Sequence, residues 1–306
     1  MSAIVECDRK NQLMIETPLV SICIPTYNGS SYLDEAFASI KAQTYTNLEV
    51  VISDDNSKDD TIALCKSFKE QIAFPVKIVA HTPNGIGANW NNTIKLAKGV
   101  FIKFLFQDDV LEPNCIKAMV QIMQRRPDLG LVACKRGFIV EGETTPSINK
   151  WIETYGNLQR QFEKDEAITI IDEKLFKQDE FIFDPRNKIG EPPTVLFKKA
   201  IIKEVGFFDE DLKQILDYVF YYRILKKYPI AIINKPLVKF RIHPAQATNI
   251  NRAAKIYDYD DYDRILHKEF LPLLHKTQQQ RLKMRFSKGY NLQRRVINKL
   301  KHIFGK

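Results

Sequence analysis

Apolar positions group into short runs that alternate with helical patterns as far as about residue 134. Between the runs, apolar residues recur at about every third or fourth position, as on one face of a helix. This alternation is typical of parallel strands joined by crossover helices. The sequence therefore predicts an α/β fold with a Rossmann-like, mostly parallel sheet flanked by helices. The predicted strands are residues 19–24, 48–53, 76–80, 100–106 and 129–134, and the predicted helices are 32–43, 61–71, 88–98 and 113–125.

The pattern changes between Glu141 and Pro193, where polar and charged positions are irregular and aromatic residues are scattered. Such a segment is either a mobile lid or a ligand-recognition region, since loops on a rigid scaffold often carry binding residues. Beyond it we expect a strand at 194–197, helices at 199–205 and 215–227, and short apolar runs at 230–233 and 237–242. The pattern divides the chain into residues 1–17, 18–140, 141–250 and 251–306.

The composition supports a folded chain in a reducing compartment. With 306 residues and 44% hydrophobic content, it can form a substantial core. The five cysteines show no metal-binding spacing, and several lie in apolar runs as ordinary core residues. Charges occupy the N-terminal stretch where a signal peptide needs apolar residues, and no apolar stretch is long enough to span a membrane. We expect a cytoplasmic protein that does not span the membrane.

The net charge of +9 lies in the C-terminal tail. Residues 276–306 hold ten Lys or Arg and no acid, leaving 36 basic against 37 acidic residues elsewhere. A nucleic-acid partner is therefore not expected for the rest of the chain. Within the tail, apolar residues from Leu292 to Phe304 share one helical arc and basic residues the other. This pattern predicts either a basic helix on an anionic membrane surface or a terminal helix packed on the fold.

Two acidic clusters, Asp54-Asp55 and Asp108-Asp109, each follow a predicted strand. Ligands of open α/β sheets bind beyond the carboxyl ends of the strands, so both clusters point to one crevice. Carboxylates there suit a base or polyol that donates hydrogen bonds, or Mg²⁺ or Mn²⁺ carrying substrate phosphates. A nucleoside diphosphate satisfies both. The alternative for the first cluster is a turn that caps the next helix.

The turn after the first strand, Pro25 to Ser30, has neither the Gly-x-Gly-x-x-Gly fingerprint nor a Walker A loop. Dinucleotide-dependent dehydrogenases and P-loop ATPases are therefore disfavoured.

Four segments in order resemble the inverting family 2 glycosyltransferases of GT-A fold, in particular those that build bacterial O-antigen and capsule. They are VSICIPTYNGSSYLDEAFASIKAQTYTNLEVVISDDNSKDDT, NWNNTIKLAKGVFIKFLFQDD, GFFDEDLKQILDYVFYYRI and FRIH. The resemblance covers about residues 18–245. It implies a GT-A fold in which 18–140 bind the nucleotide sugar, 141–250 bind the acceptor and carry catalysis, and 251–306 form a basic helical extension.

The resemblance also implies site residues. Nucleotide-binding positions are Thr26, Tyr27, Asn28, Asp55, Asn89 and Asp108. The implied ligands of a Mn²⁺ or Mg²⁺ ion are Asp108, Asp109 and His243. Many relatives carry an acid where this chain has Phe106, so the acidic motif is reduced here. For His243, a structural role is the alternative.

Asp217 falls where the family places its catalytic base, without the usual acidic neighbours, since Leu216 and Val219 stand there. The alternative is a solvated Asp at a helix N-terminus. Asp209 and Glu210 are reserve candidates. The segment Asn89-Trp90-Asn91 resembles relatives that build bacterial surface polysaccharides, and the alternative for Trp90 is a core residue.

Together these features predict a transferase that moves a sugar from UDP or dTDP to a glycan or lipid-linked glycan at the inner membrane face. A sugar-nucleotide nucleotidyltransferase and a non-catalytic glycan- or nucleotide-binding relative are the alternatives.

Overall fold

The computed structural model describes residues 17–162, 166–246, 258–287 and 289. Nine strands of these residues form one sheet in the order β3-β2-β1-β4-β8-β6-β9-β5, with β7 also paired to β9. The mixed α/β architecture predicted from the sequence is confirmed. The strands are β1 (Val20–Thr26), β2 (Leu48–Asp54), β3 (Val76–Ala80), β4 (Phe101–Phe104), β5 (Val110–Leu111), β6 (Leu131–Val140), β7 (Ile168–Ile171), β8 (Val195–Lys198) and β9 (Ile230–Ile242).

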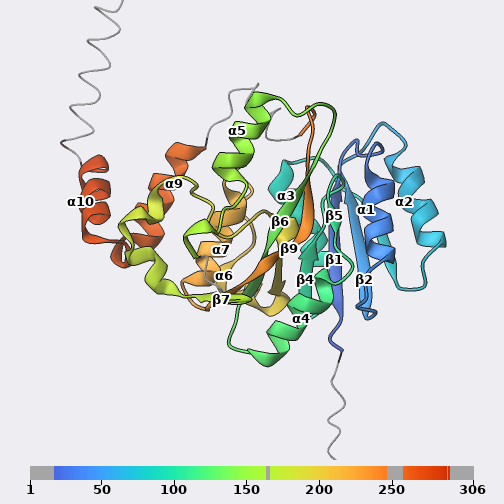
Figure 1. Ribbon diagram of the computed structural model, residues 1–306, viewed down its shortest axis with the longest axis horizontal. Coiled ribbons are helices and arrows are strands. Elements are labelled where there is room, and N and C mark those ends of the chain that lie inside the picture. The colour runs from blue at the N-terminus through green and yellow to red at the C-terminus, as the bar shows by residue number, and fades with distance from the viewer. Residues whose placement is uncertain (1–16, 163–165, 247–257, 288, 290–306) are drawn as a thin grey trace, which may run out of the picture.

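The sheet separates two hydrophobic cores (Figure 1). Helices α1 (Leu33–Lys41), α2 (Thr61–Glu70) and α4 (Cys115–Arg125) pack on one face. Helices α3 (Ile86–Leu96) and α7 (Leu216–Leu225) pack on the other. Strands β1 to β4 pair in parallel, and β1, β2 and β4 are almost wholly buried, which explains their continuous apolar runs. Strand β3, at the edge of the sheet, is only partly buried. Their carboxyl ends meet at one edge.

The second half of the sheet differs from the predicted pattern. Strand β8 runs antiparallel between β4 and β6, so the sheet is mostly but not wholly parallel. Strand β6 continues six residues past the predicted end at Cys134 because it pairs along β9. The apolar runs predicted at 230–233 and 237–242 are one strand, β9, and the β6–β9 register shifts next to Lys135. This shift is a bulge that accommodates the polar middle of β9.

The segment between β6 and β8 is ordered mainly by short helices. Helix α5 (Pro146–Tyr155) stands over the end of β6 and β9, and 3-10 turns follow at 160–162, 173–177, 179–182 and 192–194. Helix α6 (Ile202–Val205) links β8 to the loop before α7.

Helices α9 (Tyr259–Ile265) and α10 (Lys276–Arg285) lie at the end of the molecule farthest from α1 and α2 (Figure 1). Between them are a π-helical turn at 266–270 and a 3-10 turn at 271–273. Arg281 of α10 pairs with Asp263 of α9 at 3.1 Å, so part of the basic tail packs on the fold. The amphipathic arc predicted from Leu292 to Phe304 lies outside the described residues. Over the part of the chain that is described, no helix has the length and hydropathy needed to cross a membrane.

The four described cysteines, Cys23, Cys65, Cys115 and Cys134, are buried free thiols, as the sequence predicted for core residues.

Candidate active site

The carboxyl ends of β1 and β2 are tied together by the first acidic cluster. Asp54 is buried and accepts hydrogen bonds from the Thr26 hydroxyl (2.7 Å) and from the Ser57 backbone N–H (2.8 Å). Because the Thr26 side chain is buried in this contact, it shapes the turn. For Asp54, the alternative interpretation as a turn residue therefore holds.

Asp55 directly follows the end of β2. Its carboxylate contacts Nδ1 of His81 at 2.5 Å, and Asn89 of α3 lies close enough to donate to it. Burial raises the pKa of the Asp55 carboxyl, and the His81 contact opposes that rise. The sequence analysis missed His81, although a polar residue directly after the predicted third strand was the available signal.

The turn after β1 is held by side chains from two other loops. The Gln107 amide contacts both backbone groups of Tyr27, accepting from its N–H (2.9 Å) and donating to its carbonyl (3.0 Å). Asn28 has a left-handed backbone (φ 46°), and its side-chain oxygen accepts from the Lys58 N–H. The Tyr27 side chain is 57% exposed. It is thus the exposed aromatic side chain of this turn.

The second acidic cluster lies between β4 and the end of β9. Asp108 and His243 meet at 3.0 Å between Oδ2 and Nε2. Asp109 is buried, and its Oδ1 accepts from the Arg241 backbone N–H at 3.0 Å. Burial, followed by the charge of Asp108, raises the pKa of Asp109 well above its usual value.

Arg241 connects this cluster to helix α1. Its Nε donates to the Asp108 carbonyl (2.9 Å), and its Nη2 pairs with Glu35 (2.7 Å). The guanidinium also lies 4.8 Å from the ring centre of Tyr32. This network fixes the loop that presents both aspartates.

These residues have the chemistry of a divalent metal site. Asp109 Oδ2 is buried without a partner among the described residues, and Asp108 and His243 offer oxygen and nitrogen beside it. Carboxylate and imidazole ligands suit Mn²⁺, and carboxylates suit Mg²⁺. No group of three or more potential ligands is gathered within the described part of the chain. Phe106, where many relatives carry an acid, packs instead on Trp90 at 5.1 Å between ring centres.

Asp217 lies in the first turn of α7 and is only 8% exposed, not a solvated helix-end residue. Its Oδ2 accepts from Asn187 at 3.0 Å, and its Oδ1 has no partner among the described residues. Burial raises the pKa of its carboxyl from 3.8 to about 7. A carboxyl with such a pKa is able to exchange a proton near neutral pH.

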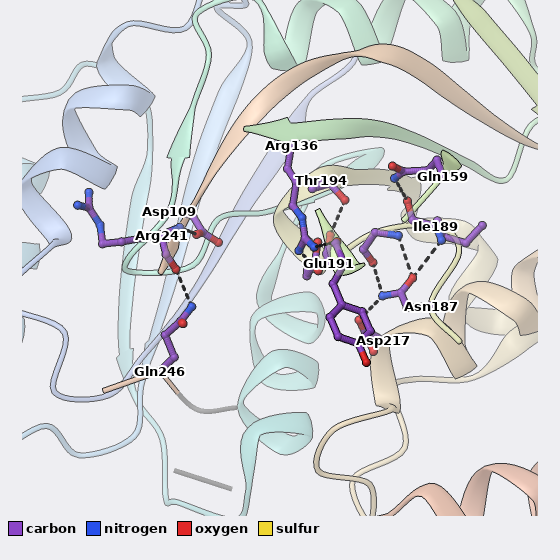
Figure 2. A network of polar contacts seen from close by, with 12 residues as sticks. Asp109, Arg136, Gln159, Asn187, Ile189, Glu191, Thr194, Asp217, Arg241 and Gln246 are labelled. Carbon is purple, nitrogen blue, oxygen red and sulfur yellow. Dashed lines mark hydrogen bonds and ion pairs between the residues drawn. The ribbon is translucent and has the colours of Figure 1, made fainter. Parts of the chain in front are cut away.

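An ion pair between Arg136 of β6 and Glu191 lies beside Asp217 (Figure 2). The Arg136 side chain is 4% exposed, and burial lowers the pKa of its guanidinium to about 9, against the opposing charges of Asp109 and Asp217. Sequence analysis missed this pair. An arginine inside an extended apolar strand was the available signal.

Asn187 fixes the loop that holds Glu191 near Asp217 (Figure 2). Its side-chain oxygen accepts from the N–H groups of Ile189 (3.0 Å) and Gly190 (2.9 Å), while its Nδ2 reaches the Asp217 carboxylate. Gly190 has φ 142°, which an L-residue rarely adopts. The loop therefore depends on Gly190 as well as on Asn187.

Two cavities meet at this point. One of about 400 Å³ is lined by Asp217, Arg136, Glu191 and Asn187, and one of about 420 Å³ by His243, Glu141 and Phe240. Trp151 of α5 lines both. His243 and the buried Asp217 therefore line two cavities that share Trp151.

The other candidates have structural contacts. Trp90 is buried against Phe104 and Phe208, so it belongs to the core. Glu210 accepts from Asn91 at 2.9 Å, and Asp209 lies 3.7 Å from Arg223.

Comparison with known proteins identifies the family. The family model "Glycosyl transferase family 2" matches residues 21–183. The chain belongs to glycosyltransferase family 2. This glycosyltransferase is 30% identical over 251 residues to an uncharacterized glycosyltransferase of Rickettsia prowazekii, covering 81% of this chain and 71% of that one.

Solved structures share the fold of this glycosyltransferase. Staphylococcus aureus TarS 1-349 in complex with UDP-GlcNAc superposes with a TM-score of 0.58 at 18% identity, covering 89% of this chain and 75% of that one. The mannosyltransferase PcManGT of Pyrobaculum calidifontis, in complex with GDP-Man and Mn²⁺, has a TM-score of 0.55 at 15% identity, covering 94% of this chain and 81% of that one. These likenesses establish the fold.

Proposed function

We propose that this glycosyltransferase moves a sugar from a nucleoside diphosphate to a hydroxyl group of a glycan, with inversion at the anomeric carbon. The observation that carries the proposal is the buried Asp217, whose carboxyl lines a 400 Å³ cavity and has a pKa of about 7. A single carboxylate so placed suffices for one displacement. One inverting step requires one general base, apart from the groups that stabilise the leaving diphosphate.

The nucleotide end of the substrate would lie at the carboxyl ends of β1 and β2. Tyr27 offers an exposed ring, and Asp55, with Asn89 nearby, offers an acceptor for a base N–H. Asp55 already contacts His81, so a base N–H would be an additional donor to its carboxylate. Uracil and thymine have such an N–H at N3, and guanine has one at N1, so this contact agrees with UDP or dTDP but does not by itself exclude GDP. The UDP-GlcNAc bound in TarS agrees with this choice.

At the other end, Asp217 performs the proton transfer. Its ionised carboxylate takes the proton from the acceptor hydroxyl as that oxygen forms a bond to the anomeric carbon. The bond to the diphosphate oxygen breaks on the opposite face, and the electron pair leaves with the diphosphate. Asn187 holds Oδ2 of Asp217, which leaves Oδ1 to receive the proton.

Asp108, Asp109 and His243 would hold a divalent metal, which stabilises the negative charge of a leaving diphosphate. Mn²⁺ is present in the PcManGT complex, in agreement with this set. Because Arg241 fixes the loop of both aspartates, this end of the site is rigid before the substrate binds.

We also propose a lipid-linked glycan as the acceptor, in synthesis of a bacterial surface polysaccharide such as O-antigen or capsule. The support is the basic amphipathic tail at 292–304, which suits an anionic membrane surface. The protein would then act in the cytoplasm at the inner face of the membrane.

A thermal-shift screen tests the nucleotide site. The full chain is heated with UDP, dTDP, GDP, CMP, UTP or dTTP, each with and without Mn²⁺ or Mg²⁺. Ligands that bind only the folded state raise its melting temperature. We expect a metal-enhanced rise with UDP or dTDP. No rise with any of them would favour a non-catalytic relative, and a rise confined to nucleoside triphosphates would favour a nucleotidyltransferase.

A further inference from the structure

We propose that Arg136 and Glu191 form the subsite that reads the transferred sugar, and that this sugar is a neutral hydroxylated pyranose. The inference deepens the proposed function and rests on it. The carrying observation is a buried ion pair that lines the same cavity as Asp217 (Figure 2).

Arg136 lies between the two groups that the transferred sugar must contact during the reaction. Its charge acts on both Asp109, at the metal-type cluster, and Asp217, the proposed base. A transferred sugar must bridge the diphosphate, held at the metal-type cluster, and the acceptor hydroxyl, held at Asp217. Arg136 therefore borders the path between them.

The pair has hydrogen-bonding capacity that the described residues do not use. Arg136 Nη1 pairs with Glu191, and its Nη2 donates to the Tyr155 carbonyl at 2.5 Å. Arg136 Nε and Glu191 Oε2 have no partner among the described residues. Buried polar atoms without partners are few in folded proteins, and each calls for an explanation such as a functional role. A sugar hydroxyl both donates and accepts, so neighbouring hydroxyls satisfy the carboxylate and the guanidinium together.

The walls of the cavity fit this ligand class. Arg136 lies 5.0–5.4 Å from the ring centres of Phe138, Trp151 and Phe240, which fix its guanidinium. Trp151 and Tyr155 also line the cavity and supply apolar surface for the C–H face of a pyranose. Glu191 keeps 22% of its side chain exposed, and a carboxylate torsion turns with little restriction, so either oxygen can face the cavity.

The charges favour a neutral sugar over a uronic acid. Glu191 already neutralises Arg136. The remaining charged residues of the lining are two carboxylates, Asp184 and Asp217, and one guanidinium, Arg186. A sugar carboxylate would meet more negative than positive charge there. The expected order of affinity is therefore hexose above glucuronate for one and the same nucleotide.

The test compares sugar conjugates with the bare nucleotide on the full chain. The screen above first selects the nucleoside diphosphate. Calorimetry with Mn²⁺ then gives dissociation constants for that nucleotide and for its glucose, galactose, N-acetylglucosamine and glucuronate conjugates. The variants are Glu191→Gln, Glu191→Asp and, as a matched change outside the cavity, Glu210→Gln.

We expect Glu191→Gln and Glu191→Asp to weaken the best neutral conjugate about tenfold, which is the value of one hydrogen bond to a charged group. Binding of the bare nucleotide should stay unchanged, which also shows that the variants are folded. Glu210→Gln should alter neither.

Three results would overturn the proposal while leaving the nucleotide site intact. They are equal losses for nucleotide and conjugate, unchanged affinity for every conjugate in both Glu191 variants, and tightest binding of the glucuronate. If no nucleoside diphosphate binds the wild type, the proposed function fails first.

Discussion

Replacing Asp217 by Asn removes a buried ionisable group, and its effect on stability should depend on pH. In the folded chain, burial raises the pKa of this carboxyl from 3.8 to about 7. Because folding raises the pKa, the group stabilises the folded state fully below pH 3.8, and this contribution is lost as pH rises through about 7. The full rise corresponds to about 4 kcal/mol.

Between pH 5 and pH 8, the wild type should therefore lose about 3 kcal/mol of unfolding free energy that the Asp217→Asn variant does not lose. The amide has its own constant packing and hydrogen-bonding effects, for example at Asn187, but these cancel when the two pH values are compared. The unfolding free energy of the variant minus that of the wild type should therefore be larger at pH 8 than at pH 5. In melting temperature the relative change is about 6 °C.

The assay is urea unfolding of both proteins at pH 5 and pH 8, followed by tryptophan fluorescence. The exposed Asp211, on the segment before α7, supplies the control, since Asp211→Asn should leave the pH dependence unchanged. If wild type and Asp217→Asn show the same pH dependence, Asp217 is not a carboxyl with a raised pKa, and its assignment as a base tuned to neutral pH is refuted.

The kcat of the wild type should rise about tenfold per pH unit below pH 7 and level off above it, because only the ionised Asp217 accepts a proton; a flat profile would exclude it. Gly190→Ala should destabilise the chain by about 2 kcal/mol in urea unfolding, since a Cβ there would lie 2.1 Å from Thr194 Oγ1 at φ 142°. Gly142→Ala, with open space around it but also at positive φ, separates backbone strain from this clash. Deleting 292–306 should weaken binding to vesicles with anionic lipid in a flotation assay, and equal binding would discard the membrane helix.

The first half of the fold was predictable because its signals are local. Strands β1 to β4 are short apolar runs bounded by turns, and the observed ends of β2 and β3 lie within one residue of the predicted ones. Both acidic clusters follow such runs, so their meeting at one edge followed from the parallel arrangement.

The second half was not predictable in this way, because distant partners decide it. Lys135 and Arg136 interrupt the apolar run of β6, yet the strand continues since β9 pairs with it and Glu191 neutralises Arg136. Pairing with β6 likewise carries β9 through its polar middle at 234–236. The roles of His81, Asn187 and Glu191 depend on contacts between segments far apart in sequence, which no local pattern encodes.

During protein synthesis, Asp109 is made before Arg241, the residue that holds it in place. The backbone N–H of Arg241 completes the hydrogen bonding of Asp109, which lies 132 residues earlier in the chain. At about 5–20 residues per second, the ribosome delivers this partner roughly ten seconds after the aspartate. Until then Asp109 lacks the backbone donor that holds it, and the loop that presents both aspartates stays unanchored. A nascent chain therefore completes this loop only when β9 emerges, so premature termination products are released without the donor that anchors Asp109.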